Sequence, residues 1–374
     1  MIGNPAWTAN VLLSTIATMS VVSAPVQTFH IAVLPGDGIG VDVTRETVRL
    51  LQALQSKLDG TWFDFSEQSV GAGEFLRSGT PLPEEAFAAC RAADAVLLGA
   101  MGIPSVRWPD GKEMTPQIDL RERLDLYAGP RPIKLYHPDD SPLKGYAAGE
   151  IDFVIVRENT EGLFSARLSS HPNDDEARDV LRLTRKGCER VIRFAFELAR
   201  KRRKHCTLVD KANVLPSMVF MRRIFDEIAE QYPDVETDRV YVDAMALFLV
   251  RKPDAFDVLV TENMFGDILS DLGGGLVGGM GMAPSGDIGD DCAIFQPSHG
   301  TAPDIAGKDI ANPTATFLSA AMMLDWLDHE QTRRGAKMIE AAVQQVFEDS
   351  TNRTPDMGGK MKTSELTDLI IAAL

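Results

Sequence analysis

The chain has 374 residues and a formal net charge of −16, and 44% of its residues are hydrophobic. This length exceeds what one hydrophobic core usually serves, so we expect two domains or one large α/β domain. The strong negative charge argues against a nucleic-acid surface and against binding to anionic membranes, so an anionic ligand must meet a local basic cluster. The four cysteines are far apart and form no CxxC pair, which favours a reducing cytoplasm over a disulfide framework.

Residues 1–27 precede the first clear element. They contain a mildly apolar run, 11–22, that superficially resembles a signal peptide. No Lys or Arg precedes this run, and polar residues dilute it too much for a membrane span. We therefore expect a disordered N-terminal extension, or a natural start at Met19.

The rest of the chain alternates predicted strands and helices. A strand at 29–34 leads through a glycine-rich turn into a helix at 41–58. Further short apolar strands are predicted at 95–100, 153–156, 207–209, 240–242 and 258–260, and long helices at 186–201, 216–232 and 311–327. This alternation predicts an α/β fold with a largely parallel sheet.

The loop at 36–40, Gly-Asp-Gly-Ile-Gly, follows the first strand but does not fit the dinucleotide fingerprint. The GxGxxG pattern needs its third glycine one place later, where Val41 stands. No acidic residue at a strand end some twenty positions on completes the pattern. We interpret the loop as a tight turn.

The segment NMFGDILSD, 263–271, carries the strongest sign of chemistry. It sets Asp267 and Asp271 four residues apart, so in a helix both carboxylates lie on one face. Two like charges there are unfavourable without a cation between them, and acidic oxygens are the ligands that Mg²⁺ or Mn²⁺ prefers. Asp243, after another apolar strand, is a third candidate. The alternative is an ordinary exposed helix edge, which apolar neighbours such as Ile268 disfavour.

Basic residues suggest the ligand. Arg121, Arg131 and Arg157 stand at predicted strand ends and loop edges, which suit bidentate capture of carboxylates. One such arginine is usually structural, but three in an acidic protein suggest a substrate with two or more carboxylates. Lys211 follows a strand and is either a solvated turn residue or a base whose pKa burial lowers. The turn-rich segment 295–315 could hold a nucleotide, or could simply cap a helix.

Together these segments resemble the β-decarboxylating dehydrogenases, the family of 3-isopropylmalate, isocitrate, homoisocitrate and tartrate dehydrogenases. The similarity is greatest to the 3-isopropylmalate dehydrogenases, and it runs from about residue 29 to the C-terminus through LPGDGIG, LDLYAGPRP, VRENTEG, VDAMAL, NMFGDILSD and HGTAPDIAGKDIANPTA. The resemblance implies a two-domain isopropylmalate dehydrogenase-like fold with a non-Rossmann NAD site. It implies a discontinuous NAD-binding domain at 28–126 and 278–374, and a substrate, metal and dimerisation domain at 127–277.

The resemblance also implies roles for individual residues. Lys211 and Asp243 would be catalytic and would come from the partner subunit of a homodimer with shared active sites. Asp243, Asp267 and Asp271 would bind Mg²⁺ or Mn²⁺. The residues that would bind the hydroxy-dicarboxylate substrate are Arg121, Arg131, Arg157, Gln117, Ile118 and Phe164. The residues that would bind NAD are His299, Gly300, Thr301, Ala302, Pro303, Asp304, Ile305, Asn312 and Asn213, with the acid Asp304 favouring NAD over NADP.

Two positions depart from the family pattern. Phe164 stands where well-known relatives have a tyrosine, so either another group protonates the enolate carbon or decarboxylation is slow or absent. Met114, Gln117 and Ile118 stand where isopropylmalate enzymes have an acid and two leucines. An unsatisfied glutamine against an isopropyl group would cost roughly 1–3 kcal/mol, so we expect a smaller or more polar substituent.

From this resemblance we expect a cytoplasmic oxidoreductase of the leucine-biosynthesis type. It would oxidise, with decarboxylation, a 2-hydroxy acid that carries a 3-carboxylate, and 3-isopropylmalate is the leading substrate. D-malate or tartrate, and homoisocitrate or isocitrate, are alternatives. A catalytically silent regulatory subunit is a further alternative, which the retention of Lys211 and of all three aspartates disfavours.

Overall fold

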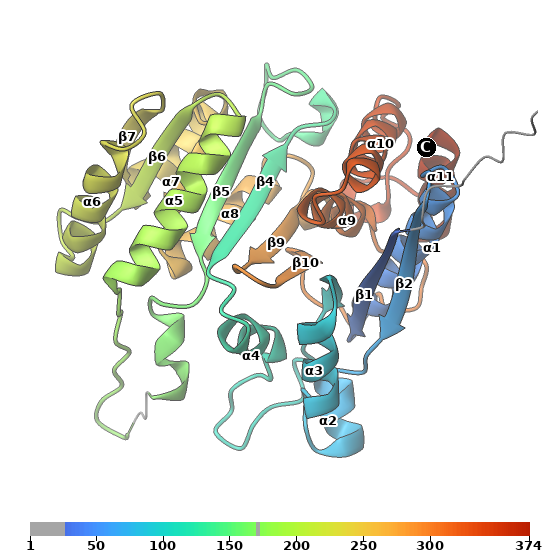
Figure 1. Cartoon of the computed structure of the whole chain (residues 1–374), viewed down its shortest axis with the longest axis horizontal. Helices are drawn as coiled ribbons and strands as arrows, with labels where there is room; N and C mark the ends of the chain where they lie inside the picture. Colours follow the sequence, from blue (N-terminus) through green and yellow to red (C-terminus); the bar gives the residue numbers. More distant parts are fainter. Residues whose placement is uncertain (1–26, 170–172) are drawn as a thin grey trace, which may run out of the picture.

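A ten-stranded sheet forms the centre of the computed structural model, which describes residues 27–169 and 173–374 (Figure 1). The strand order is β2-β1-β3-β10-β9-β4-β5-β8-β6-β7. Six neighbouring pairs are parallel, and the three central pairs, β10–β9, β9–β4 and β4–β5, are antiparallel. The predicted α/β fold with a largely parallel sheet is confirmed. Residues 1–26 of the predicted extension lie outside the described residues.

The element bounds are as follows. The strands are β1 Gln27–Gly36, β2 Thr61–Glu67, β3 Ala95–Ala100, β4 Ala128–Lys134, β5 Asp152–Glu158, β6 His205–Asp210, β7 Glu236–Tyr241, β8 Val258–Thr261, β9 Pro284–Ile288 and β10 Ala293–Pro297. The helices are α1 Ile39–Gln55, α2 Ala72–Ser78, α3 Glu84–Ala92, α4 Pro116–Arg123, α5 Arg185–Lys201, α6 Pro216–Ala229, α7 Val242–Arg251, α8 Asn263–Gly275, α9 Thr314–Trp326, α10 Glu330–Phe347 and α11 Thr363–Ala373. None of these helices has the length and apolar character needed to cross a membrane.

Most predicted elements are present with small shifts at their ends. The helix predicted at 311–327 starts at Thr314, after the N-cap residue Pro313, and the Asn312 side chain accepts a hydrogen bond from the Thr314 N–H at 3.0 Å. The strand predicted to reach Val242 ends one residue earlier, where α7 begins. The short strands β2, β4, β9 and β10 were not predicted.

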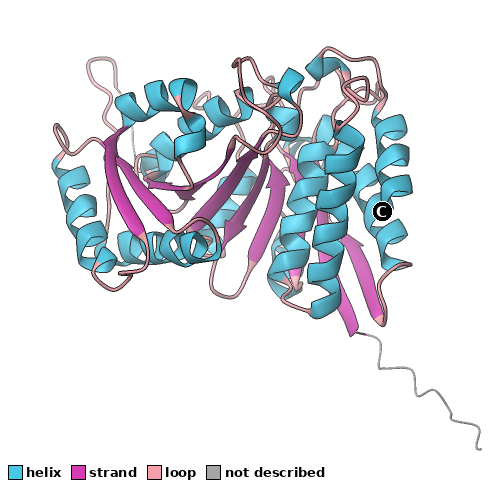
Figure 2. Ribbon diagram, turned by 90° about the horizontal axis from the view of Figure 1, so that it is seen from above, coloured by secondary structure: helices cyan, strands magenta, loops and turns pink. Residues whose placement is uncertain are grey.

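Helices cover both faces of the sheet (Figure 2). Alternate residues of β5 point to opposite sides, as the pleat requires. Val154 and Val156 belong to the core beneath α5 and α6, whereas Phe153 and Ile155 belong to the core beneath α7 and α8. Burial on both faces explains why the strand reads as a continuous apolar run. In the other part of the sheet, α9 packs on β9 and β10 and contacts α10.

The sheet is joined at its centre by little backbone pairing. Residues 27–100 and 284–297 supply the strands from β2 to β9, and residues 128–261 supply those from β4 to β7. These two sets meet where β9 pairs with β4, through the single residue pair Ala128↔Ile288. Pro130 and Pro132 in β4 have no N–H to donate, which fits a strand whose pairing on one side stops early. The predicted domain division at 126–127 and 277–278 falls near this junction and stays a prediction.

The carboxyl ends of parallel strands gather the residues of interest at one edge of the sheet. Arg157 lies near the end of β5, and Lys211 directly follows β6. Asp243 directly follows β7 in the first turn of α7, and α8 begins shortly after β8. Ligand sites of parallel α/β sheets usually lie at this edge.

Candidate active site

The acid pair predicted from NMFGDILSD lies on α8. The helix start is fixed by Glu262, whose carboxylate accepts a hydrogen bond from the Phe265 N–H at 2.7 Å. Burial and the neighbouring Asp267 raise the pKa of Asp271. Two carboxylates that repel each other in this way form the kind of site at which a bound cation is favoured.

What surrounds this pair differs from the expectation. Ile268 is 60% exposed, so the inference that apolar neighbours keep this helix edge from being open was wrong at that residue. The Asp267 carboxylate instead forms an ion pair with the Arg157 guanidinium. Basic groups, rather than an apolar cover, distinguish this helix face from an ordinary exposed edge.

Three buried arginines form a cluster beside the acid pair. The exposed fractions of Arg121, Arg131 and Arg157 are 7%, 5% and 2%, and they come from α4, β4 and β5. Burial, followed by the nearness of the other two arginines, lowers the pKa of Arg157 to about 9, and Asp267 opposes this shift. Burial and Arg121 likewise lower the pKa of Arg131, against the nearby acids, which include Asp271. The structure therefore brings all three predicted arginines together with both acids of α8.

Arg157 is held in place by α8. Its Nε and Nη2 donate to the Asn263 Oδ1 at 3.0 and 2.7 Å. A Cβ at Gly266 would lie 2.7 Å from the Arg157 Cβ, so the glycine of NMFGD allows the arginine to pass against the helix. The Phe164 ring, in the short 3-10 helix Phe164–Leu168, has its centroid 5.1 Å from the Arg157 Cζ, a cation–π contact.

Arg131 was expected at a loop edge, but it lies inside β4. Its Nη1 donates to the Ser298 Oγ at 3.0 Å, and its buried Nε has no hydrogen-bond partner among the described residues. One turn before Arg121 on α4, the buried Oε1 of Gln117 also has no partner there. Buried polar atoms without partners are costly, so both atoms are candidates to meet a ligand. Ile118 is half-buried beside Gln117.

Sequence reasoning missed Asp287, which lies next to this cluster. Its carboxylate on β9 accepts hydrogen bonds from the Arg121 Nε at 2.9 Å, the Asn159 Nδ2 at 2.8 Å and the Gln296 Nε2 at 2.6 Å. The signal available in the sequence was a single acid inside PSGDIG. It could not be used, because β9 itself was not predicted.

Lys211 and Asp243 form a separate pair at the far edge of the sheet. The Lys211 Nζ lies 2.7 Å from the Asp243 Oδ1, and this hydrogen bond lowers the pKa of Asp243. The Asp243 side chain is 68% exposed. Within the described part of the chain, no three His, Cys, Asp or Glu side chains gather closely enough to hold a metal ion. A single copy of the chain thus supplies two of the three predicted aspartate ligands at one place and the third at another.

The glycine loop packs against the predicted nucleotide-binding loop. The Ile39 N–H donates to the Thr301 carbonyl at 2.8 Å, and the Gly307 N–H donates to the Asp42 carboxylate at 2.7 Å. Gly38 has φ of 59°, and a Cβ there would lie 2.1 Å from the Thr301 oxygen. These contacts agree with the tight-turn interpretation of this loop.

The predicted NAD residues divide into three groups. His299 to Ile305 form one loop, in which Gly300, Pro303 and Asp304 are exposed, while Thr301 is buried and Ala302 is partly buried. Burial lowers the pKa of His299, and its Nε2 has no partner among the described residues. An exposed acid on the same loop as an unpartnered imidazole nitrogen is compatible with binding the ribose of a dinucleotide. Asn312 is buried and accepts a hydrogen bond from the first N–H of α9. Asn213 lies two residues after Lys211, in the segment that follows β6.

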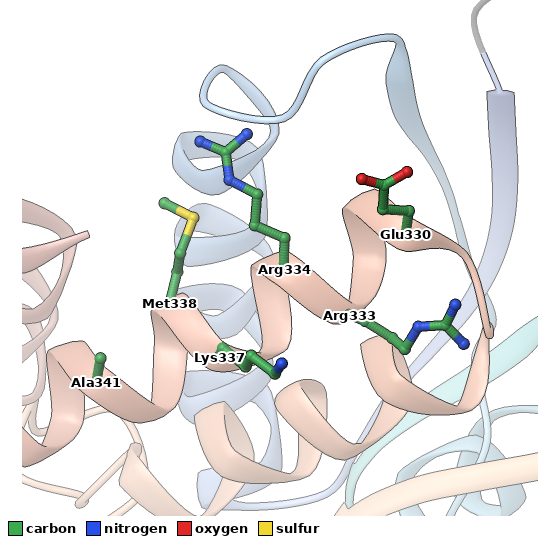
Figure 3. Close-up of a pocket in the computed structure, with 6 residues that line it drawn as sticks. All are labelled: Glu330, Arg333, Arg334, Lys337, Met338 and Ala341. Carbon is green, nitrogen blue, oxygen red and sulfur yellow. The ribbon is translucent and has the colours of Figure 1, made fainter.

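A hollow of about 500 Å³ lies elsewhere, along α10 (Figure 3). Its lining residues are Glu330, Arg333, Arg334, Lys337, Met338 and Ala341. They all belong to one helix, and Arg333 forms an ion pair with Asp328 beside it. None of the predicted site residues lies there, so the hollow does not bear on the predicted chemistry.

Comparisons with known proteins agree with the motifs. Residues 30–370 match the family model described as isocitrate/isopropylmalate dehydrogenase. A 3-isopropylmalate dehydrogenase from Aquifex aeolicus is 41% identical over 359 residues, covering 92% of this chain and 97% of that relative. One from Corynebacterium efficiens is 44% identical, covering 92% and 99%. A crystal structure of isocitrate dehydrogenase from Methylococcus capsulatus superposes with a TM-score of 0.83 at 38% identity, covering 92% of this chain and 99% of that one.

Proposed function

The chain belongs to the isocitrate/isopropylmalate dehydrogenase family, and from this premise we propose that it oxidises a 2-hydroxy acid carrying a 3-carboxylate, with NAD⁺ as hydride acceptor and Mg²⁺ or Mn²⁺ bound. The resemblance read from the motifs is confirmed at the level of the family. Its relatives named 3-isopropylmalate dehydrogenase are decarboxylating hydroxy-acid dehydrogenases. The substrate, the cofactor and the roles of single residues are the proposal.

One observation carries the proposal: three buried guanidinium groups lie beside two carboxylates of one helix face. Buried cations of like sign are unfavourable unless anions meet them, and planar guanidinium groups bind carboxylates in two-pronged fashion. Asp267 and Asp287 each pair with one of these arginines, and a dicarboxylate substrate would supply the further anions. The acids of α8 offer the oxygen donors that a divalent cation prefers.

The chain's own residues would divide the work. Arg121, Arg131 and Arg157 would bind the substrate carboxylates and orient C2. Lys211, hydrogen-bonded to Asp243, would accept the proton of the C2 hydroxyl. When bound, the metal would supply Lewis-acid polarisation of the oxygen on C2, and NAD⁺ would accept the hydride. Phe164 has no proton to donate, so water or another group would protonate the carbon from which CO₂ leaves.

The residues fit a metal ion only if two copies of the chain combine. Asp267 and Asp271 offer two carboxylates, and Asp243 lies apart on α7. We propose a homodimer in which Lys211 and Asp243 of one copy complete the site of the other. Exposed apolar side chains flank both sets of residues and support this proposal: Val214, Val219, Tyr241, Leu247, Val250 and Ile268.

The favoured substrate is 3-isopropylmalate, because the relatives with this name align over nearly the whole chain. The polar side chain of Gln117 would also suit a smaller or more polar C3 substituent, so D-malate and tartrate stay candidate substrates. The isocitrate dehydrogenase likeness keeps the tricarboxylates isocitrate and homoisocitrate as further candidates. We place the enzyme in the cytoplasm, where four free cysteines, three of them buried, stay reduced.

A substrate panel tests this function. Purified protein is mixed with NAD⁺, Mn²⁺ and each acid in turn, and NADH absorbance and trapped CO₂ are measured together. We expect NADH formation with one acid, no NADH after metal chelation, and one CO₂ for each NADH if decarboxylation follows oxidation. NADH formation without CO₂ release would mean that the enzyme with Phe164 oxidises its substrate but does not decarboxylate it. No NADH with any acid would favour a catalytically silent subunit.

A further inference from the structure

We propose that Asp287 is a positioning residue: its carboxylate fixes Arg121 and acts as a built-in counter-ion that fits the arginine cluster to a dicarboxylate rather than a tricarboxylate. This inference rests on the proposed function, which assigns the cluster to substrate carboxylates.

The geometry of Asp287 is that of a fixed anchor. The residue is 1% exposed, and both of its carboxylate oxygens are occupied. Oδ2 accepts from the Arg121 Nε at 2.9 Å and from the Gln296 Nε2 at 2.6 Å, while Oδ1 accepts from the Asn159 Nδ2 at 2.8 Å. The carboxylate cannot rotate without breaking several of these bonds, so it holds Arg121 in one orientation.

The contact with Arg121 leaves the functional end of that side chain free. Asp287 binds the guanidinium at Nε, and among the described residues the two terminal nitrogens of Arg121 make no hydrogen bond. Those two nitrogens form the fork that binds a carboxylate in bidentate fashion. Asp287 thus orients the guanidinium without competing for that fork.

Asp287 also lies where the two parts of the sheet meet. It precedes Ile288, whose partner Ala128 makes the only residue pair between β9 and β4 in the described structure. Its three donors come from α4, β10 and the segment after β5. The Asp287 carboxylate therefore links the two parts of the sheet, because Gln296 belongs to one part and Asn159 to the other.

The charges at the site indicate which anion fits. The three arginines are cations, and Asp287 forms an ion pair with one of them, Arg121. Compared with a neutral residue at the same position, Asp287 lowers the positive charge that the cluster offers to a substrate by one. A lower positive charge weakens the attraction for a third carboxylate, so the pair favours a dicarboxylate. Gln117, on the same face of α4 as Arg121, is neutral and offers no cation for a third carboxylate.

The test separates charge from position with two variants of the full chain. Asp287→Asn removes the charge and keeps the size, whereas Asp287→Glu keeps the charge and displaces it. Titration calorimetry in the presence of Mn²⁺ and NADH measures the Kd of succinate, a dicarboxylate probe, and of tricarballylate, a tricarboxylate probe. Neither measurement needs turnover.

We expect the wild-type protein to bind succinate more tightly than tricarballylate. Asp287→Asn should shift the ratio of the two Kd values toward tricarballylate by at least about fivefold, about 1 kcal/mol. Asp287→Glu should weaken succinate binding and leave the ratio near the wild-type value. If Asp287→Asn does not fold, Asp287→Ser removes the same charge with less volume.

Asp257→Asn is the matched control. Asp257 is also 1% exposed and accepts hydrogen bonds from the Arg202 Nε and the Arg203 N–H, but it lies at the opposite end of β8 from the site. It should lower the thermal midpoint without changing the Kd ratio. An unchanged ratio in Asp287→Asn, with wild-type protein binding succinate, overturns this inference alone. Wild-type protein that binds neither probe overturns the proposed function instead.

Discussion

At the scale of single residues, the site places ionisable groups where water cannot reach them. Glu158 directly follows Arg157 and is almost completely buried, with its carboxylate accepting hydrogen bonds from the N–H groups of Thr160 and Glu161 at 2.8 and 2.7 Å. Burial nevertheless prevails and raises the pKa of Glu158 from an ordinary 4.5 to about 7. The folded protein therefore keeps this proton at a pH at which the unfolded chain has lost it.

This shift predicts a pH dependence of stability. Between pH 4.5 and about 7 the folded state binds more protons than the unfolded state, so the free energy of unfolding falls as the pH rises through that window. The stability that protonated Glu158 contributes is fully present below pH 4.5 and is lost as the pH rises to about 7. The difference in the free energy of unfolding is up to about 3 kcal/mol. Urea unfolding at a series of pH values gives the free energy of unfolding at each pH. That free energy should fall less steeply with rising pH in Glu158→Gln than in wild-type protein. Parallel stability curves would show that Glu158 does not titrate in this window.

Some features of the candidate site could be predicted from the sequence alone, and others could not. The spacing of Asp267 and Asp271 is a property of any helix, so their shared face was predictable. The gathering of Arg121, Arg131 and Arg157 followed only from the number of arginines and from the family resemblance. Their common anion, Asp287, was not predictable, because which acid meets which arginine depends on how distant strands are paired.

At the scale of elements, α7 exposes an apolar side of its surface. Met245 and Leu249 are buried, whereas Leu247 is 58% exposed. A helix that presents such side chains beside the proposed catalytic pair, Lys211 and Asp243, is expected to pack against a second copy. Leu247→Glu should therefore shift the protein toward monomer in light scattering and abolish NADH formation, because a buried charge at an interface is strongly unfavourable.

Leu76→Glu is the matched control for this change. Leu76 is even more exposed than Leu247, but it lies on α2, away from the predicted catalytic residues. It should leave both assembly and activity unchanged. A Leu247→Glu protein that remains a dimer with full activity would contradict the assignment of α7 to the interface.

Two of the strands that were missed, β4 and β9, share a cause. A parallel strand buried on both faces is a run of apolar residues, and such runs, including 95–100 and 258–260, were found. The antiparallel strands of the centre carry residues that sequence patterns assign to turns: β4 contains Pro130 and Pro132, and β9 contains Gly286. Their strand structure depends on neighbours in the sheet rather than on local preference.

At the scale of the whole molecule, the predicted metal-binding and catalytic residues lie in two separate places on one copy of the chain. The family resemblance implied that Lys211 and Asp243 act on the partner's site, and composition alone could not have suggested it. In the described structure this pair lies at the edge of the sheet formed by β6 and β7, whereas Asp267 lies on α8, which packs on β5 and β4. Each copy would then hold two half-sites rather than one complete site.

Mixing two inactive variants tests this arrangement directly. Lys211→Met removes the proposed base and Asp267→Asn removes a proposed metal ligand, so each protein alone should be inactive. After unfolding and refolding an equal mixture, about half of the dimers contain one copy of each, and each mixed dimer has one site with no substitution, so activity should recover to about one quarter of the wild-type value. A mixture of Lys211→Met and Asp243→Asn is the control, because both substitutions affect the same half-site and every site keeps one of them. No recovery in the first mixture, despite mixed dimers detected by mass spectrometry, would mean that each active site is built from one copy of the chain.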